Sequence, residues 1–168
     1  MTSRIARRGA WRGGIYAFAL GCLTLRSVGG TDAVVWEVNH LDRIGGNPVT
    51  VVGAPVVTNG AVVFDGRGDG LFLNANPLEG MAAFTVEILF SPAADGDTEQ
   101  RFLHLEDDAG RRLLIEIRLD GTGGWWLDTV LRDGESKRPL IDPLRVHRAG
   151  QWTGAALRYD GKIMAHYV

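Results

Sequence analysis

The sequence predicts an all-β domain of two packed antiparallel sheets, and three features predict it. From Val34 onward, apolar and polar residues alternate with a period of two, as on strands that bury one face. Turn residues interrupt these runs at short intervals, and 23 glycines supply the tight turns that short strands need. Beyond the first 30 residues, no window has the period of an amphipathic helix. Repeated short strands of this kind form a sandwich or a jelly roll.

The strands are expected in a regular series along residues 34–168. They are predicted at 34–38, two or three within 48–63, 71–73, 84–90, 101–106, 111–120, 124–131, 137–141, 151–159 and 163–168. Asn59-Gly60 and Asp160-Gly161 are strong sequence signals for hairpin turns. Two rows of alternate residues are predicted to face the core: Phe84, Val86, Ile88 and Phe90, and Leu113, Ile115 and Ile117.

The first 30 residues are expected to be a signal or membrane-targeting segment, with the folded domain spanning 31–168. Residues 1–12 are basic, and 13–25 form an apolar run shorter than the roughly 20 residues of a transmembrane helix. This pattern predicts export to an extracellular, periplasmic or cell-surface location. An N-terminal helix packed on the domain is the alternative.

Two further targeting signals are partly matched. Ala19-Leu20-Gly21-Cys22 is similar to a bacterial lipobox, which would make acylated Cys22 a membrane anchor, although Ala19 replaces the usual bulky aliphatic residue. Arg7-Arg8 suggests a twin-arginine signal, but the residues that follow favour an ordinary leader. Cys22 is the one cysteine, so the chain forms no intrachain disulfide.

The charge distribution argues against a nucleic-acid partner. The formal net charge is −2, and residues 1–30 contribute five arginines and no acid. The remaining 13 basic and 20 acidic residues leave the domain with a net charge of −7. An acidic domain of this kind has no electrostatic footprint for nucleic acid or for an anionic membrane surface.

A series of short motifs resembles the laminin-G-like jelly roll of the concanavalin A-like lectin and glucanase superfamily. The motifs are Ala61-Val62-Val63-Phe64-Asp65-Gly66, Asp69-Gly70-Leu71, Phe84-Thr85-Val86-Glu87, Gly150-Gln151-Trp152 and Tyr159-Asp160-Gly161. The resemblance implies a two-sheet jelly roll over about residues 34–168. In the family a histidine often follows the tryptophan, where this chain has Thr153-Gly154. The family also continues beyond Tyr167-Val168 with one or two closing strands. The resemblance therefore implies either a fragment truncated at the C-terminus or an edge covered by another chain.

One sheet face is the predicted ligand surface. If the apolar rows face the core, alternation places a polar set on the opposite face: Glu87, His104, Glu116, Arg118, Trp126 and Asp128. Phe102, His104 and Glu106 are expected to share one face of their strand. Enzymes and lectins of the resembled fold commonly hold sugars on such a face. The alternative is a solvated sheet surface with cross-strand ion pairs.

No catalytic residue is assigned. Cleavage of a glycosidic bond needs two suitably separated carboxyl groups. The glucanases of the superfamily carry Glu-x-Asp-x-(x)-Glu, which Glu116-Ile117-Arg118-Leu119-Asp120 does not match. Lyases of similar fold use an Arg, Glu, Arg strand with a nearby Gln-x-His, which Arg112–Arg118 and Phe102-Leu103-His104 match only loosely.

Asp65 and Asp69 are the candidate metal ligands, with calcium as the ion. They stand with Asn74 in neighbouring turns, and calcium binds oxygen ligands. The alternative is that Asp-Gly is simply a favourable turn pair. The four histidines lack zinc spacing, and no phosphate-binding or dinucleotide-binding motif is present.

These observations favour an exported noncatalytic module that binds carbohydrate or an extracellular protein. Two alternatives stay open: a glycoside hydrolase or polysaccharide lyase that uses the polar face, and a structural or assembly domain of a larger protein. The sequence does not indicate an oligomeric state.

Overall fold

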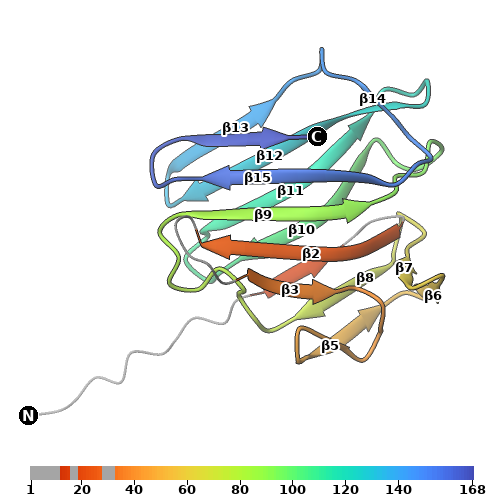
Figure 1. Ribbon diagram of the computed structural model, residues 1–168, viewed down its shortest axis with the longest axis horizontal. Coiled ribbons are helices and arrows are strands. Elements are labelled where there is room, and N and C mark those ends of the chain that lie inside the picture. The colour runs from red at the N-terminus through yellow and green to blue at the C-terminus, as the bar shows by residue number, and fades with distance from the viewer. Residues whose placement is uncertain (1–11, 16–18, 28–32) are drawn as a thin grey trace, which may run out of the picture.

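A computed structural model describes residues 12–15, 19–27 and 33–168 of the chain. These residues form an all-β structure of two antiparallel sheets, as the sequence predicts (Figure 1). The described residues include no helix that is long and apolar enough to cross a membrane.

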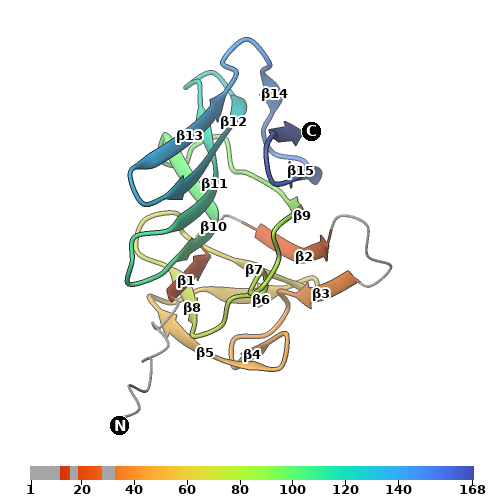
Figure 2. The ribbon, with the colours of Figure 1, turned by 90° about the vertical axis from the view of Figure 1, so that its left-hand side faces the viewer.

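The two sheets pack face to face as separate layers (Figure 2). Sheet A has the order β13 (Ser136–Ile141), β12 (Gly124–Asp133), β11 (Arg112–Leu119), β10 (Glu99–Glu106), β1 (Arg12–Ile15), β8 (Gly70–Leu73), β5 (Asn47–Val52) and β4 (Arg43–Ile44), and β14 (His147–Arg148) also pairs with β12. Sheet B has the order β16 (Met164–Tyr167), β15 (Thr153–Tyr159), β9 (Phe84–Phe90), β2 (Ala19–Ser27), β7 (Ala61–Val63) and β6 (Val56–Thr58), and β3 (Ala33–Glu37) also pairs with β2.

The core lies between the sheets and contains both predicted apolar rows. The four residues of β9 that the alternation assigns to the core, from Phe84 to Phe90, are at most 6% exposed. Leu113, Ile115 and Ile117 of β11 are at most 4% exposed on the facing layer. Each such side chain removes enough apolar area from water to contribute about 1.5–3 kcal/mol of transfer free energy.

An aromatic cluster joins the two sheets at the centre of this core. The ring of Phe90 from sheet B lies 4.1 Å from that of Phe102 and 5.3 Å from that of Trp125, both on sheet A. Trp125 is fully buried, and its indole Nε1 donates a hydrogen bond of 3.1 Å to the carbonyl of Arg148. Period-two alternation allows only one residue of the pair Trp125-Trp126 to face inward, and it is Trp125.

Part of the segment expected as a leader lies inside the sandwich. β1 pairs with β10 and β8, and β2 pairs with β9 on one side and with β7 and β3 on the other. Leu23 and Leu25 are buried, whereas Cys22 and Thr24 are half-buried on the opposite face of β2. The expected domain start at residue 31 therefore differs from the structure, in which sheet residues occur from Arg12. Residues 13–25 are almost all small or apolar, so the alternation between the two faces of β2 was not visible in the sequence.

Candidate functional site

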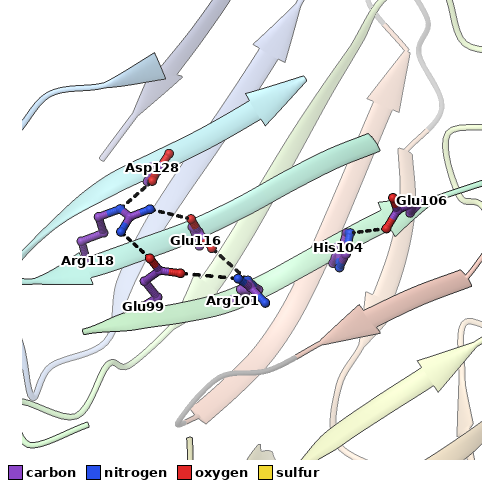
Figure 3. A network of polar contacts seen from close by, with 7 residues as sticks. All are labelled: Glu99, Arg101, His104, Glu106, Glu116, Arg118 and Asp128. Atoms are coloured by element: carbon purple, nitrogen blue, oxygen red, sulfur yellow. Dashed lines mark hydrogen bonds and ion pairs between the residues drawn. The ribbon is translucent and has the colours of Figure 1, made fainter. Parts of the chain in front are cut away.

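A network of acids and arginines covers part of the outer face of sheet A. Its members, called here the acid–arginine network, are Glu99, Arg101, Glu116, Arg118 and Asp128 (Figure 3). They come from β10, β11 and β12, where Glu99 is opposite Arg118, Arg101 is opposite Glu116, and Glu116 is opposite Asp128. Directly opposed residues on antiparallel strands point to the same side, so the register brings all five side chains together.

Arg118 occupies the centre of the network and contacts all three acids. Its Nε lies 2.7 Å from Asp128 Oδ2, its Nη1 2.5 Å from Glu99 Oε1, and its Nη2 3.4 Å from Glu116 Oε1. Arg101 contributes a second set, with Nε 3.1 Å from Glu116 Oε2 and Nη2 3.4 Å from Glu99 Oε2. The arginines therefore bridge three strands through their planar guanidinium groups.

The network has a buried acidic floor and an exposed fringe. The side chains of Glu116 and Asp128, called here the floor, are 4% and 3% exposed. Those of Arg101, Glu99 and Arg118, called here the fringe, are 46%, 43% and 31% exposed. Burial raises the pKa of Glu116, and the neighbouring Asp128 raises it further against the lowering effect of Arg101. The hydrogen bond to Asp128 raises the pKa of Arg118.

This geometry limits the access of a substrate to the two buried carboxyl groups. The two carboxyl groups of the floor lie beneath the arginines, so a substrate would meet the fringe first. Glu99 is exposed, but both arginines already bind it. Catalysis by a carboxyl group requires that it reach the proton or the carbon atom concerned. The fringe instead offers donors and acceptors in fixed positions.

His104 lies on the same outer face but belongs to a separate cluster. Its Nε2 is 3.1 Å from Glu106 Oε2, and Arg112 Nη2 is 2.8 Å from Glu106 Oε1 (Figure 3). Burial and the charge of Arg112 lower the pKa of His104, which disfavours the cationic form of the imidazole. The hydrogen bond from Arg112 lowers the pKa of Glu106. His104 is thus outward-facing, as predicted, but not in contact with the network.

Because β10 contains a β-bulge, the facing predicted for Arg101 and Phe102 is wrong. The register to β11 shifts between Arg101 and Leu103, so one extra residue is accommodated there. Phe102 is buried in the core, whereas the sequence placed it on the same face as His104. Arg101 instead points outward into the network. Strict alternation fails at a bulge because two residues of one strand oppose one residue of its neighbour.

Glu87 does not join the predicted surface. It is exposed on β9 of sheet B, where it lies opposite Thr24 of β2 and Ala156 of β15. The prediction of an outward side chain is correct, but the outer face of sheet B lies on the other side of the sandwich. By contrast, Trp126 is half-buried beside the network, directly opposite Arg118.

The two predicted metal ligands instead organise turns. Asp69 is 7% exposed, and its carboxylate accepts hydrogen bonds from the backbone amides of Ala54 at 2.7 Å and Asp65 at 2.8 Å. Asp65 Oδ1 accepts three more, from the amides of Arg67, Gly68 and Asp69. These hydrogen bonds engage both carboxylate oxygens of Asp69 and the Oδ1 of Asp65.

No group of three or more histidine, cysteine, aspartate or glutamate side chains is arranged to hold a metal ion within the ranges that the structure describes. Asp120, the residue that follows β11, also organises a turn. Its Oδ1 accepts hydrogen bonds from the amides of Thr122 and Gly124 at 2.7 and 2.8 Å.

A pocket of about 410 Å³ opens at the edge of the sandwich between β12, the loop after β13, and β16. Leu127, Leu140 and Met164 form its apolar wall. His166 Nδ1 lies 3.3 Å from Thr129 Oγ1, and burial lowers the pKa of that imidazole. The sequence did not indicate this site, because its polar residues are scattered over β13 to β16 without a motif spacing.

Comparison with known proteins identifies no relative: no family model, curated protein or solved structure matches the chain.

Proposed function

We propose that the domain is a noncatalytic binding module for carbohydrate, and that the outer face of sheet A around the acid–arginine network contacts the ligand. The supporting observation is the division between the buried acids and the exposed fringe. Carbohydrate hydroxyl groups both donate and accept hydrogen bonds, and Glu99 with Arg101 presents an acceptor and donors side by side. Trp126 offers an aromatic surface at the margin, which suits the apolar face of a sugar ring.

A glycan array with the purified domain, followed by calorimetry on the best ligand, tests this proposal. Arg101→Ala and Trp126→Ala should each weaken binding about tenfold or more, equivalent to about 1.4 kcal/mol. Arg158→Ala is the matched control, because Arg158 is an exposed arginine on sheet B. Equal losses in all three variants, or full affinity in both sheet A variants, would move the ligand surface elsewhere.

The same purified domain should release no product from the glycans that it binds. Assays for new reducing ends and for unsaturated products cover hydrolysis and lyase chemistry, respectively. Turnover that disappears in Glu116→Gln or His104→Ala would instead support a polysaccharide-cleaving enzyme.

A second candidate is binding of a protein partner, or assembly within a larger protein, through the edge strand β16. Its residues Met164, Ala165, His166 and Tyr167 include no lysine, acid or proline, which natural edge strands commonly use to prevent pairing. Leu144 and Val146, near the same edge, are 93% and 51% exposed. Light scattering of the wild type and of Ala165→Lys would detect self-association through this strand as a loss of the oligomer in the variant.

We propose that the domain acts outside the cytoplasm, as the basic and apolar start of the sequence indicates. Fractionation and intact-mass measurement in a bacterial host test export, processing and acylation of Cys22. Cleavage immediately before Cys22 would remove β1 and the first residues of β2, and cleavage near residue 30 would remove both strands, so the mass of the folded species is informative.

A further inference from the structure

One buried oxygen in the acid–arginine network lacks a hydrogen-bond donor. Asp128 is 2% exposed, and its Oδ2 accepts from Arg118 Nε. Its Oδ1 is inaccessible to solvent and receives no hydrogen bond from a described residue when every acid is ionised. A buried carboxylate oxygen without a hydrogen-bond donor is unfavourable, so the arrangement calls for a proton donor beside it.

Glu116 is placed to supply that donor. It lies directly opposite Asp128 on the neighbouring strand, and its side chain is equally buried. Glu116 Oε2 accepts from Arg101, and Oε1 is 3.4 Å from Arg118, the longest contact of that arginine. Oε1 is therefore the oxygen that can carry a proton at the least cost in lost ion pairing.

The charge count leads to the same conclusion. The network holds three acids and two arginines, which leaves one excess negative charge if all five groups are ionised. Two of the acids are withdrawn from solvent, where an uncompensated charge is expensive and neutralisation is the usual result.

We propose that Glu116 and Asp128 share one proton at neutral pH, with the carboxyl group of Glu116 donating to Asp128 Oδ1. The shared proton makes the acid–arginine network electrically neutral. The same proton satisfies the otherwise unpaired oxygen.

The surroundings of the pair support this assignment. On β10, Glu99 and Arg101 face it, and on β11, Arg118 does so. On β13, the residue opposite Asp128 is Ile141, which carries no charge. On β16, the charge of Asp128 acts on His166, but burial lowers the pKa of that imidazole and so disfavours its cationic form. No additional cation therefore comes from these strands to compensate the second acid.

The shared proton makes the stability of the fold depend on pH. A carboxyl group whose pKa is raised on folding stabilises the fold fully below its ordinary value near 4.5, and this contribution is lost as pH rises through the raised pKa. Glu116→Gln provides a permanent donor in place of the proton. The melting temperature of the wild type should therefore fall relative to that of the variant as pH rises above about 5.

Infrared spectroscopy tests the proton directly. The wild type at neutral pH should show the carbonyl band of one protonated carboxyl group, shifted in heavy water, and Glu116→Gln should lack it. Asp128→Asn, which also supplies a donor to the pair, should lose the band too. Asp95→Asn is the control, because Asp95 is exposed in a turn and its removal should leave the band unchanged.

Absence of the band in the folded wild type at neutral pH would overturn the proposal, as would parallel melting curves of the wild type and Glu116→Gln across the pH range. Neither measurement involves a glycan. A further expectation rests on the function proposed above: a neutral network prefers uncharged sugars to uronic or sulfated ones. The glycan array tests that preference separately, so failure of one proposal is distinguishable from failure of the other.

Discussion

At the scale of single residues, Asp69 joins two turns that are distant in sequence. Its two carboxylate oxygens bind the amides of Ala54 and Asp65, and Gly53 approaches it so closely that a Cβ there would lie 2.2 Å from Asp69 Oδ1. Gly53 also has a φ of +76°, which disfavours any side chain. The position of the Asp69 carboxylate therefore requires a glycine at residue 53.

Asp69→Ala should lower the free energy of unfolding by about 1–3 kcal/mol, because two amides lose their buried acceptor. Urea titration measures this loss. Asp95→Ala, a change of the same kind at an exposed position without such contacts, should change stability by less than about 0.5 kcal/mol. If calcium added to the wild type raised its stability and had no effect on Asp69→Ala, the role of Asp69 would be ligation of the metal.

Val86 and Glu87 provide a second residue-scale comparison, because they are neighbours on β9 with opposite facing. Val86 is 0% exposed and Glu87 is exposed. Val86→Asp should unfold the domain, since an unpaired buried carboxylate costs several kcal/mol, on the order of 2–7. Glu87→Asp should retain the melting temperature. A folded Val86→Asp protein would show that the facing of β9 is reversed.

At the scale of elements, the predicted strands match the observed ones closely wherever alternation and turn residues coincide. β9 has the predicted bounds, β11 and β16 are each one residue shorter than predicted at both ends, and β15 begins two residues later than predicted and ends where predicted. β1 and β2 were not predicted as strands, because a continuous apolar run has no visible period. The bulge in β10 was not predicted either, because no residue type indicates where the register between two strands will shift.

The place of β2 in sheet B leads to a matched prediction. Leu25 is 0% exposed, and Thr24 faces outward on the same strand. Leu25→Asp should abolish the cooperative unfolding transition, whereas Thr24→Asp should preserve it. Circular dichroism during heating reads out both. If both variants melted like the wild type, β2 would not be part of the folded domain, and the prediction of a removable leader would gain support.

At the scale of the whole molecule, the sequence predicted the layers but not the partners of each strand. Glu87 and Glu116 both face outward, as expected, yet they lie on opposite sides of the sandwich because β9 and β11 belong to different sheets. Sheet membership depends on pairing between distant segments, which local periodicity does not encode. His104 and Glu116 share a sheet face, but only their contacts show that they belong to separate clusters.

Stability of the whole molecule should be greatest in mildly acidic solution. Hydrogen bonds from backbone amides lower the pKa of Asp65, Asp120 and Asp160 below 3.8, so their contribution is lost as pH falls through the lowered values. The raised pKa of Glu116 has the opposite effect on the alkaline side. Calorimetry from about pH 2 to about pH 9 should show a maximum between these limits. A melting temperature that rises steadily to the alkaline limit would contradict it.

The central position of the N-terminal strands sets the order in which the protein can fold. β1 and β2 leave the ribosome first, yet their partners β10 and β9 are synthesised much later. Such distant pairing gives a high contact order and slow folding. Until β9 and β10 are synthesised, β1 can pair only with β8, and β2 only with β3 and β7. The uncovered edges of β1 and β2 favour aggregation and chaperone binding during that time. The nascent chain should remain sensitive to protease until β9 and β10 have emerged, and become resistant afterwards.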